Sequence, residues 1–450
     1  MNFTKGILLG SAASLLSIAA ASAADLPSRK SAPVEYVKVC SAYGAGFFFI
    51  PGTDTCLKFG GRIRADYAYV PAKNQFSSSN ALGVGVVNKA KDGANTLGWE
   101  ARGALNFDAR TATAWGTVQS TASIRLARVT GSLDKDYAAS ATSASPTLEY
   151  AYVRFAGFTF GAARDNFAFM PSLTYGAGHW GSFANGAKQI SYTATFGGGV
   201  SATIALQDYL DTASDKSISN LPTGGYYVYN SAPQINANIR IDQSWGALQL
   251  MGAYADVSTN TATDSYDFNK GVYAIGAGVK INLPMLAKGD SLSLTANYAN
   301  GMTEYTTNWT SFKSSAYKRD VGGYTMNHPS LVAESTGLET VKSWNVAALL
   351  EHYWAPQYRS VLFTSYGQLD APTGAKARVW DGTKSFGDAT VWNLGTNFAW
   401  LPTKGMEIGV EVIYARVNQD VRNTVGTAAG SVLSKSDSNV TGRLRVERNF

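Results

Sequence analysis

The sequence predicts an all-β protein, a transmembrane up-and-down antiparallel β-barrel of sixteen strands, and three observations lead to this prediction. Short segments with one apolar and one polar face recur from residue 57 to the carboxyl terminus. Successive side chains of a strand point to opposite faces, so this alternation indicates two-faced strands. Long and short connections alternate between the segments, and the chain ends on an aromatic residue, Phe450. In a barrel, that terminal ring would lie in the interfacial girdle.

Residues 1–23 have the features of a secretory signal peptide. Lys5 gives a basic start, residues 6–21 are apolar, and the small residues Ala21-Ser22-Ala23 form a cleavage site. A membrane anchor that stays attached is the alternative, but the apolar run is too short for a spanning helix and ends in small residues. We therefore expect an exported chain that is cleaved after Ala23.

The composition limits both the partners and the kind of membrane segment. The chain of 450 residues has a formal net charge of +6, and loss of Lys5 with the signal leaves +5, which implies no nucleic-acid partner. The long uncharged runs 166–187, 189–207 and 217–239 are broken by Gly, Pro, Ser, Thr, Asn or Gln, so none indicates a spanning helix. Only helices and closed barrels satisfy the backbone inside lipid, so a membrane protein of this composition has to be a barrel.

The two cysteines, Cys40 and Cys56, are separated by fifteen residues in a chain that is expected to be exported. A disulfide is the expected state, and closing such a loop constrains the unfolded chain by about 3 kcal/mol. Two free thiols are the alternative. The histidines His179, His328 and His352 show no ligand spacing to the cysteines, so we expect no metal site. Residues 24–56 are thus interpreted as a periplasmic amino-terminal segment with a disulfide loop.

The barrel domain is predicted over residues 57–450. Its first strand sets Phe59 and Ile63 on one face against Arg62, Arg64 and Asp66 on the other. The sixteen predicted strands are 57–70, 96–108, 114–127, 147–156, 157–163, 189–196, 200–208, 235–243, 246–255, 272–283, 290–299, 343–353, 359–367, 390–400, 405–416 and 438–450. A barrel of this strand number leaves an aqueous lumen, which the polar faces would line.

The connections between these strands predict the topology. The long ones are 71–95, 128–146, 164–188, 209–234, 256–271, 300–342, 368–389 and 417–437. The short ones are 109–113, 156–157, 197–199, 244–245, 284–289, 354–358 and 401–404. Strict alternation is expected of a barrel with long outer loops, short periplasmic turns and both termini in the periplasm. A soluble sandwich with Greek-key crossovers would not be expected to give it.

The segment 35–64 resembles the amino-terminal signature of alphaproteobacterial general porins. Both Cys40 and Cys56 and the Phe-Ile-Pro-Gly-Thr run at 49–53 belong to this resemblance, and the ending at 448–450 fits it. The resemblance implies a homotrimer of barrels in the outer membrane, surrounded by its lipid and lipopolysaccharide. Each barrel would be a passive diffusion pore for ions and small hydrophilic solutes. It also implies that the third long loop folds into the lumen and narrows it.

The third long loop is expected at about 164–188, and it is rich in large apolar residues, namely Phe167, Phe169, Met170, Pro171, Tyr175, His179, Trp180 and Phe183. Packing against the barrel wall would explain them. An ordinary outer loop folded on itself is the alternative. General porins carry several acids on this loop, whereas Asp165 is the only one here. We expect Asp165 to line the constriction, and Glu100 or Asp66 on the wall would have to supply the rest of the acidic side of the pore.

Basic residues of inward parity are expected to line the pore, namely Arg62, Arg64, Arg102, Arg125, Arg443 and Arg445. The first and last strands are neighbours in a closed barrel, so these residues would form one cluster. Such a cluster raises the local anion concentration. The alternative is a solvated face whose charges pair locally, such as Arg102 with Glu100. Because Glu351, Glu407 and Glu411 also have inward parity, we predict at most a weak anion preference.

A passive pore is therefore the leading functional hypothesis. A channel selective for an anion such as phosphate, or for a sugar, is the second, and would need a basic ladder or an aromatic line through the lumen. A structural or adhesive barrel that binds through its long loops is a third. An outer-membrane lipid hydrolase would need a serine beside a histidine, which the three histidines do not suggest. The Gly276-Ala-Gly278 sequence lies within a strand and is not a dinucleotide loop. We expect no catalytic residue and no cofactor.

Overall fold

The computed structural model describes the greater part of the chain. The described residues are 38–69, 76–77, 88–89, 97–131, 146–176, 185–208, 226–229, 232–261, 268–306, 331–334, 337–372, 384–385, 388–423 and 432–450. The predicted signal peptide lies outside them. The chain divides into two compact units, Met1–Cys56 and Leu57–Phe450.

The smaller unit is a loop closed by the predicted disulfide. Cys40 and Cys56 are bonded, with 6.0 Å between their Cα atoms. A 3-10 helix, η1 (Ser41–Tyr43), and a short strand, β1 (Phe48–Phe49), lie between them. Phe47 packs on the two cysteines, and all three side chains are buried. So short a segment lacks a large apolar core, and the disulfide stabilises its fold instead.

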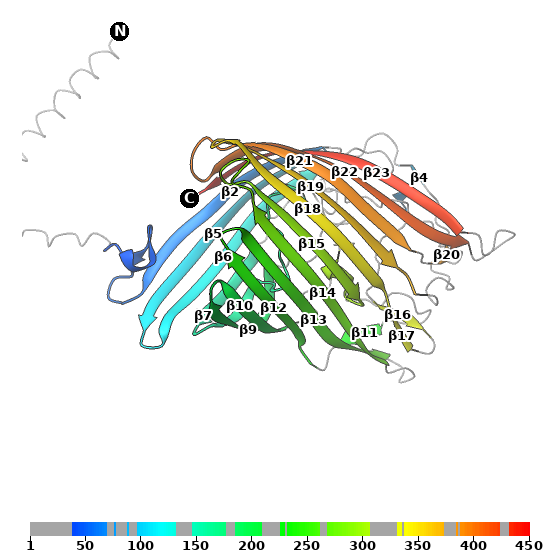
Figure 1. Ribbon diagram of the computed structural model, residues 1–450, viewed down its shortest axis with the longest axis horizontal. Coiled ribbons are helices and arrows are strands. Elements are labelled where there is room, and N and C mark those ends of the chain that lie inside the picture. Colours follow the sequence, from blue (N-terminus) through cyan, green and yellow to red (C-terminus); the bar gives the residue numbers. More distant parts are fainter. Residues whose placement is uncertain are drawn as a thin grey trace, which may run out of the picture. The chain divides into compact units, whose positions relative to one another are not determined.

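The larger unit is a closed antiparallel barrel, as predicted (Figure 1). Within the described residues sixteen strands form its wall: β2 (Cys56–Tyr69), β5 (Leu97–Thr113), β6 (Gly116–Gly131), β7 (Thr147–Phe155), β8 (Phe158–Arg164), β9 (Asn185–Gly197), β10 (Val200–Gln207), β12 (Gln234–Gln243), β13 (Gly246–Thr261), β14 (Phe268–Asn282), β15 (Ser291–Asn300), β18 (Lys342–Ala355), β19 (Tyr358–Asp370), β21 (Ala389–Trp400), β22 (Met406–Asn423) and β23 (Val432–Asn449). Each pairs with the next, and β23 pairs with β2, so the sheet has no free edge.

Short elements accompany the wall at the long connections. β11 (Tyr226–Tyr229) pairs with β13, and β20 (Lys384–Ser385) pairs with β22. Two small hairpins are formed by β3 (Phe76–Ser77) with β4 (Asn88–Lys89), and by β16 (Leu331–Glu334) with β17 (Gly337–Thr340). A 3-10 helix, η2 (Thr303–Tyr305), follows β15.

The short connections lie at one end of the barrel and most are two-residue turns. In the turn between β9 and β10, Gly198 and Gly199 have φ angles of 55° and 76°. Positive φ at both positions is what a two-residue hairpin turn needs, and glycine adopts it without strain. This requirement explains the glycine run at 197–199.

Two of the predicted long loops are shorter than expected. The connection between β13 and β14 is 262–267, and that between β22 and β23 is 424–431, because these strands extend beyond their predicted ends. The prediction ended each strand where apolar residues stopped alternating. Backbone pairing continues past that point, and Val257 of β13, for example, still pairs with Lys270 of β14. The ladder of hydrogen bonds needs no apolar face once the strand leaves the membrane.

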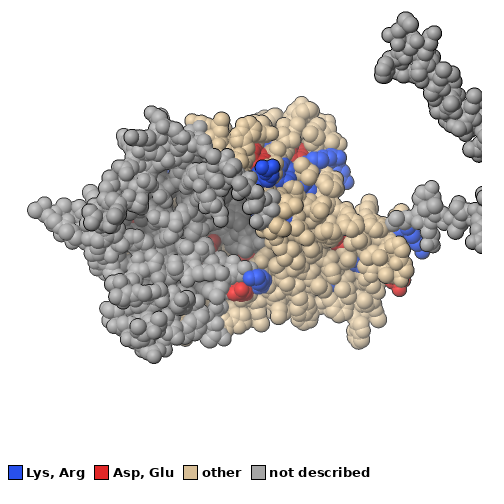
Figure 2. Space-filling model, turned by 180° about the vertical axis from the view of Figure 1, so that it is seen from behind, with Lys and Arg blue, Asp and Glu red and all other residues tan. Residues whose placement is uncertain are grey.

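The outer wall is apolar and aromatic, as a lipid-facing surface requires. Large apolar side chains, mostly of one parity within a strand, are exposed on most of the strands, including Ile63, Leu105, Ile204, Ile239 and Leu250. Ring pairs join neighbouring strands, with 5.4 Å between the centroids of Trp344 and Tyr366 and 5.0 Å between those of Trp392 and Tyr414. Figure 2 shows a described surface that is mostly uncharged, with basic and acidic residues in only a few places. This is the inverse of a soluble protein, in which large apolar side chains point inward.

No helix in the described part of the chain is long and apolar enough to cross a membrane.

Candidate functional site in the barrel lumen

The third long connection turns into the barrel after β8. Near its start the Asn166 carbonyl accepts hydrogen bonds from Asn238 on β12, at 2.7 Å, and from Gln249 on β13, at 3.2 Å. Near the end of its described part, Tyr175 contacts β22 and β23. The segment 165–176 therefore crosses the lumen from one wall to another. The rest of the predicted loop, with His179, Trp180 and Phe183, lies outside the described residues.

The tip of this segment is held by charged residues of the opposite wall. The Glu411 carboxylate accepts the backbone N–H groups of Tyr175, at 2.7 Å, and of Gly176, at 2.5 Å. The Tyr175 carbonyl accepts from Arg443 at 2.6 Å and from Arg445 at 3.0 Å. The Arg445 guanidinium also lies 4.7 Å from the centre of the Tyr175 ring. The tip is thus bound through both its donors and its acceptor.

The Tyr175 side chain continues along the same wall. Its hydroxyl donates to Glu407 at 2.5 Å. Burial raises the pKa of the Tyr175 phenol, and the neighbouring Glu407 raises it further, so the hydroxyl stays protonated and remains a donor. A side chain on Gly409 would occupy the position of this hydroxyl.

Apolar side chains hold the middle of the segment. Phe167 and Met170 are buried, and Phe169 packs on the clusters that contain them. Inward-facing residues of β13, β14 and β15 surround Phe167, and those of β18, β19, β21 and β22 surround Met170. On β14, a Cβ on Gly276 would meet the Phe167 ring, and one on Gly278 would meet the Phe169 ring. The two glycines of the Gly276-Ala-Gly278 sequence therefore leave space for the rings of two loop phenylalanines.

Asp165 is only 2% exposed, and its carboxylate anchors the loop. It accepts from the Phe167 N–H and from the Asn236 side chain, each at 2.8 Å, and from the Tyr305 hydroxyl at 3.3 Å. Tyr305 comes from η2, and its ring lies 4.5 Å from that of Phe167. A second long connection thus reaches the lumen and supports the first. The sequence had suggested instead that Asp165 faces the pore.

The seam between the first and last strands carries a buried charge cluster. Asp66 pairs with Arg445 at 2.7 Å and with Arg443 at 3.4 Å, and Asp66 is 1% exposed. Arg64 pairs with Glu447 at 2.5 Å. The antiparallel register sets Arg64 opposite Glu447 and Asp66 opposite Arg445, so strand pairing itself brings these charges together.

The remaining predicted residues line the wall beside this seam. Arg102 donates two hydrogen bonds to Glu100, the local pairing that the sequence had left as an alternative. Arg62 on β2 and Arg125 on β6 both reach one carboxylate, Glu149 on β7, at 3.4 Å and 3.7 Å. Of the predicted wall residues, Arg62, Arg64, Arg102 and Arg125 are all partly exposed.

Glu149 was missed by the sequence analysis because it occupies a β-bulge. Ser123 pairs with Tyr150, and the next residue, Ile124, pairs with Leu148, so Glu149 has no partner opposite. A bulge rotates the residues on either side relative to strict alternation. The signal was present, since Leu148 and Val153 both face outward although their spacing is odd.

A second residue that the sequence analysis missed, Arg359, lies farther along the lumen wall. Arg359 on β19 pairs with Glu407 at 2.8 Å and lies 3.9 Å from Glu351. The parity of Glu351, Glu407 and Glu411 had indicated that they face inward, and all three contact inward-facing groups. Arg359 had the same parity signal but no motif that singled it out.

Comparison with known proteins identifies the family of this barrel. A profile described as Porin subfamily matches residues 25–443. The chain belongs to the porin subfamily. Porin Omp2b of Brucella canis is 31% identical over 263 residues, which cover 56% of this chain and 66% of that protein. Porin Omp2a of Brucella ovis is 31% identical over 278 residues, which cover 58% and 72%. This porin thus matches slightly less than two thirds of the length of Omp2b.

Solved structures share the fold of this porin. The outer membrane channel DcaP of Acinetobacter baumannii superposes with a TM-score of 0.59 at 15% identity, covering 89% of this chain and 99% of that one. OprB of Pseudomonas putida gives 0.50 at 9% identity, covering 88% and 94%. At these identities the likeness concerns the fold alone. Family and fold together place this porin in the outer membrane.

Proposed function

We propose that this porin forms a water-filled channel through which ions and small hydrophilic solutes diffuse passively across the outer membrane, without a catalytic step. The observation that carries the proposal is a loop bound across a polar lumen. The segment 165–176 narrows the channel on one side, and the partly exposed arginines of β2, β5 and β6 line the other. Solutes are then sorted by width and charge, and no selective binding site is required.

The charges favour a weak preference for anions. Around the seam, six arginines (Arg62, Arg64, Arg102, Arg125, Arg443 and Arg445) face four carboxylates (Asp66, Glu100, Glu149 and Glu447). Farther along the wall, Glu351, Glu407 and Glu411 outnumber Arg359. The basic excess is therefore local, and the effect on passing ions is small.

Single-channel recording of the refolded protein in a planar bilayer tests this function. We expect stepwise conductance that rises with salt concentration without saturating, and a small reversal potential of the anion-selective sign under a salt gradient. Absence of conductance would refute a channel. Saturation by one solute, such as phosphate or a sugar, would favour the substrate-selective alternative.

We also propose a homotrimer in which the wall from β7 to β10 faces a second copy. β8 has seven residues, which reach about 23 Å along the strand and about 18 Å along the membrane normal at a tilt of about 40°. This is less than the apolar band of about 25 Å that lipid requires. The exposed ion pair of Lys188 and Asp208, at 3.7 Å, sits just beyond the apolar residues of β9 and β10. A wall that contains a strand too short for lipid is better covered by protein.

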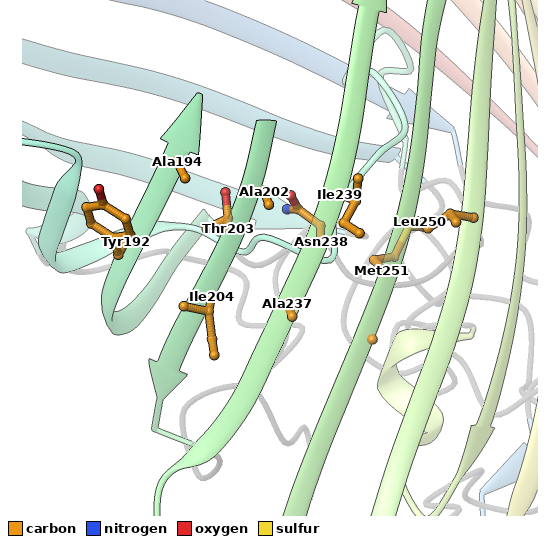
Figure 3. Close-up of a pocket in the computed structure, with 11 residues that line it drawn as sticks. Tyr192, Ala194, Ala202, Thr203, Ile204, Ala237, Asn238, Ile239, Leu250 and Met251 are labelled. Atoms are coloured by element: carbon orange, nitrogen blue, oxygen red, sulfur yellow. The ribbon is translucent and has the colours of Figure 1, made fainter. Parts of the chain in front are cut away.

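The shape of this wall also favours a second copy. Figure 3 shows Ala194, Ala202 and Ala237 on neighbouring strands, with larger side chains around them. Such small residues leave a shallow groove into which another copy can pack closely. The resemblance to general porins favours three copies, and outer-membrane lipid, including lipopolysaccharide, would cover the remaining wall.

The assembly is tested by the mass of the detergent-solubilised protein. Ala202→Trp fills the groove and should reduce the trimer fraction, whereas Ala296→Trp on the outward face of β15 should not. A monomeric wild-type protein, or equal effects of both substitutions, would contradict the proposed interface.

Export with cleavage after Ala23 is a further proposal, and the amino-terminal sequence of the mature protein tests it.

A further inference from the structure

Two arginines of the lumen wall share a single carboxylate. Arg62 and Arg125 have side chains that are 25% and 29% exposed, more than those of Arg64 and Arg102. Both approach Glu149, at 3.4 Å and 3.7 Å. The Glu149 carboxylate also accepts a hydrogen bond from the Ser123 hydroxyl at 3.3 Å. This group therefore carries two positive charges and one negative charge.

The other arginines of the wall are engaged more closely. Arg64 lies 2.5 Å from Glu447, Arg102 2.5 Å from Glu100, and Arg445 2.7 Å from Asp66. By contrast, the Nε atoms of Arg62 and Arg125 have no hydrogen-bond partner among the described residues. Those Nε atoms are themselves buried, so a passing anion would contact the exposed parts of the two guanidinium groups, whose ion pairs are long.

The backbone is built to hold Glu149 in this place. Its bulge on β7 turns the side chain inward. The start of β9, which is separated from β7 by β8 in the sheet, approaches the bulge so closely that a Cβ on Gly186 would lie 2.8 Å from the Glu149 carbonyl oxygen. Gly186 has a φ of 97°, which an L side chain rarely adopts. The bulge at Glu149 on β7 is thus accommodated by a glycine on β9, at the point where the two strands approach each other.

We propose that Glu149 sets the ion selectivity of the pore by occupying the arginine pair that would otherwise attract small anions. The inference rests on the proposed channel function and assigns its selectivity to one residue. A unit charge about 7 Å from an ion in water changes the local ion concentration by about a factor of three. Its removal raises the anion concentration and lowers the cation concentration, so the permeability ratio changes by up to about ninefold, and by less at high salt.

Reversal potentials of Glu149→Gln under a potassium chloride gradient test the proposal. Glutamine has the same shape, so the bulge and the Ser123 contact can persist. We expect the chloride-to-potassium permeability ratio to rise about three- to ninefold at low salt. The double variant Arg125→Gln with Glu149→Gln restores the net charge of the group and should return the ratio close to that of the wild type. Inorganic phosphate should reduce the chloride current of Glu149→Gln more than that of the wild type.

A matched control removes the same charge from the outer wall. Asp256 accepts a hydrogen bond from Tyr254, which is exposed on the outward face of β13. Asp256→Asn should leave the permeability ratio unchanged. Conducting channels in which Glu149→Gln shifts the ratio no more than Asp256→Asn does would overturn the assignment and leave the channel function intact. Absence of conductance in the wild-type protein would instead refute the channel itself.

Discussion

At the scale of single residues, the lumen of this porin is organised by carboxylates that bind more than one partner. Asp66 holds two arginines, Glu149 holds two more, and Glu411 holds two successive N–H groups of the third loop. Removing the carboxylate of Asp66 or Glu411 leaves its buried partners without their acceptor. The loss then exceeds the net contribution of a single hydrogen bond.

Glu411→Gln should loosen the tip of the third loop. An amide presents only one oxygen, so one of the N–H groups of Tyr175 and Gly176 would face an NH₂ group. Loss of a hydrogen bond to a charged acceptor costs about 1.5–3 kcal/mol. We expect larger and noisier single-channel conductance, while Glu351→Gln, which removes a carboxylate that pairs with Arg359 and not with the loop, should keep the wild-type noise. Identical current noise in both variants would contradict the role of Glu411.

At the scale of elements, the third loop and the β14 strand fit each other. The loop supplies Phe167 and Phe169, and the strand supplies Gly276 and Gly278 where those rings lie. Glycine inside a strand is unfavourable by itself, since it adds backbone entropy and has no side chain to pack. The close approach of the Phe169 ring explains the glycine at 278, whereas at 276 the Asn297 and Met251 side chains of the wall crowd the same space as the Phe167 ring.

Gly278→Leu should displace Phe169 and shift the loop within the lumen. The added side chain occupies the space of the ring, so we expect a changed mean conductance with folding into the barrel retained. Gly442→Leu is the control, because no atom of the described residues lies within 4 Å of a Cβ at that outward position of β23. The two variants are compared by single-channel conductance and by the heat-dependent mobility shift of the folded barrel. A wild-type conductance for Gly278→Leu would show that the ring does not hold the loop.

At the scale of the whole molecule, closure of the barrel depends on pairing the first strand with the last. The β2–β23 ladder runs from Arg62 opposite Asn449 to Tyr69 opposite Gly442. Gly61 and Phe450 exchange two backbone hydrogen bonds of 3.0 Å, and the Phe450 ring fills the space beside Gly61. Closure removes the free edges that would otherwise be left unpaired in lipid.

Asp66→Asn should weaken this closure. It leaves Arg443 and Arg445 without their shared carboxylate in a buried seam, a change that costs about 3–5 kcal/mol. Thermal unfolding followed by circular dichroism should show a lower midpoint. Asp108→Asn is the control, since Asp108 and Arg110 are a partly exposed pair within one strand, and loss of such a pair costs about 0–1 kcal/mol. Equal midpoints for the two variants would contradict a stabilising role of the seam.

The sequence by itself determined the class of fold, the strand number and the disulfide, because each rests on local information. The alternation of apolar and polar side chains, the glycines of the turns and the spacing of the two cysteines can each be recognised within a short stretch of sequence. The inward parity of Arg62, Arg64, Arg102 and Arg125 follows from the same alternation. Parity also placed Arg443 and Arg445 beside Arg64, since closure makes the first and last strands neighbours.

Only the tertiary structure decided which charges meet and which are free to meet solutes. Asp165 belongs to the loop anchor because Asn236 and Tyr305, far away in the sequence, surround it. Glu149 lies beside Arg62 and Arg125 because of a bulge, which breaks the alternation on which the prediction relied. The seating of the loop and the pairing of charges depend on contacts between distant segments, which leave no periodic pattern in the chain, and the bulge left only the odd spacing of Leu148 and Val153.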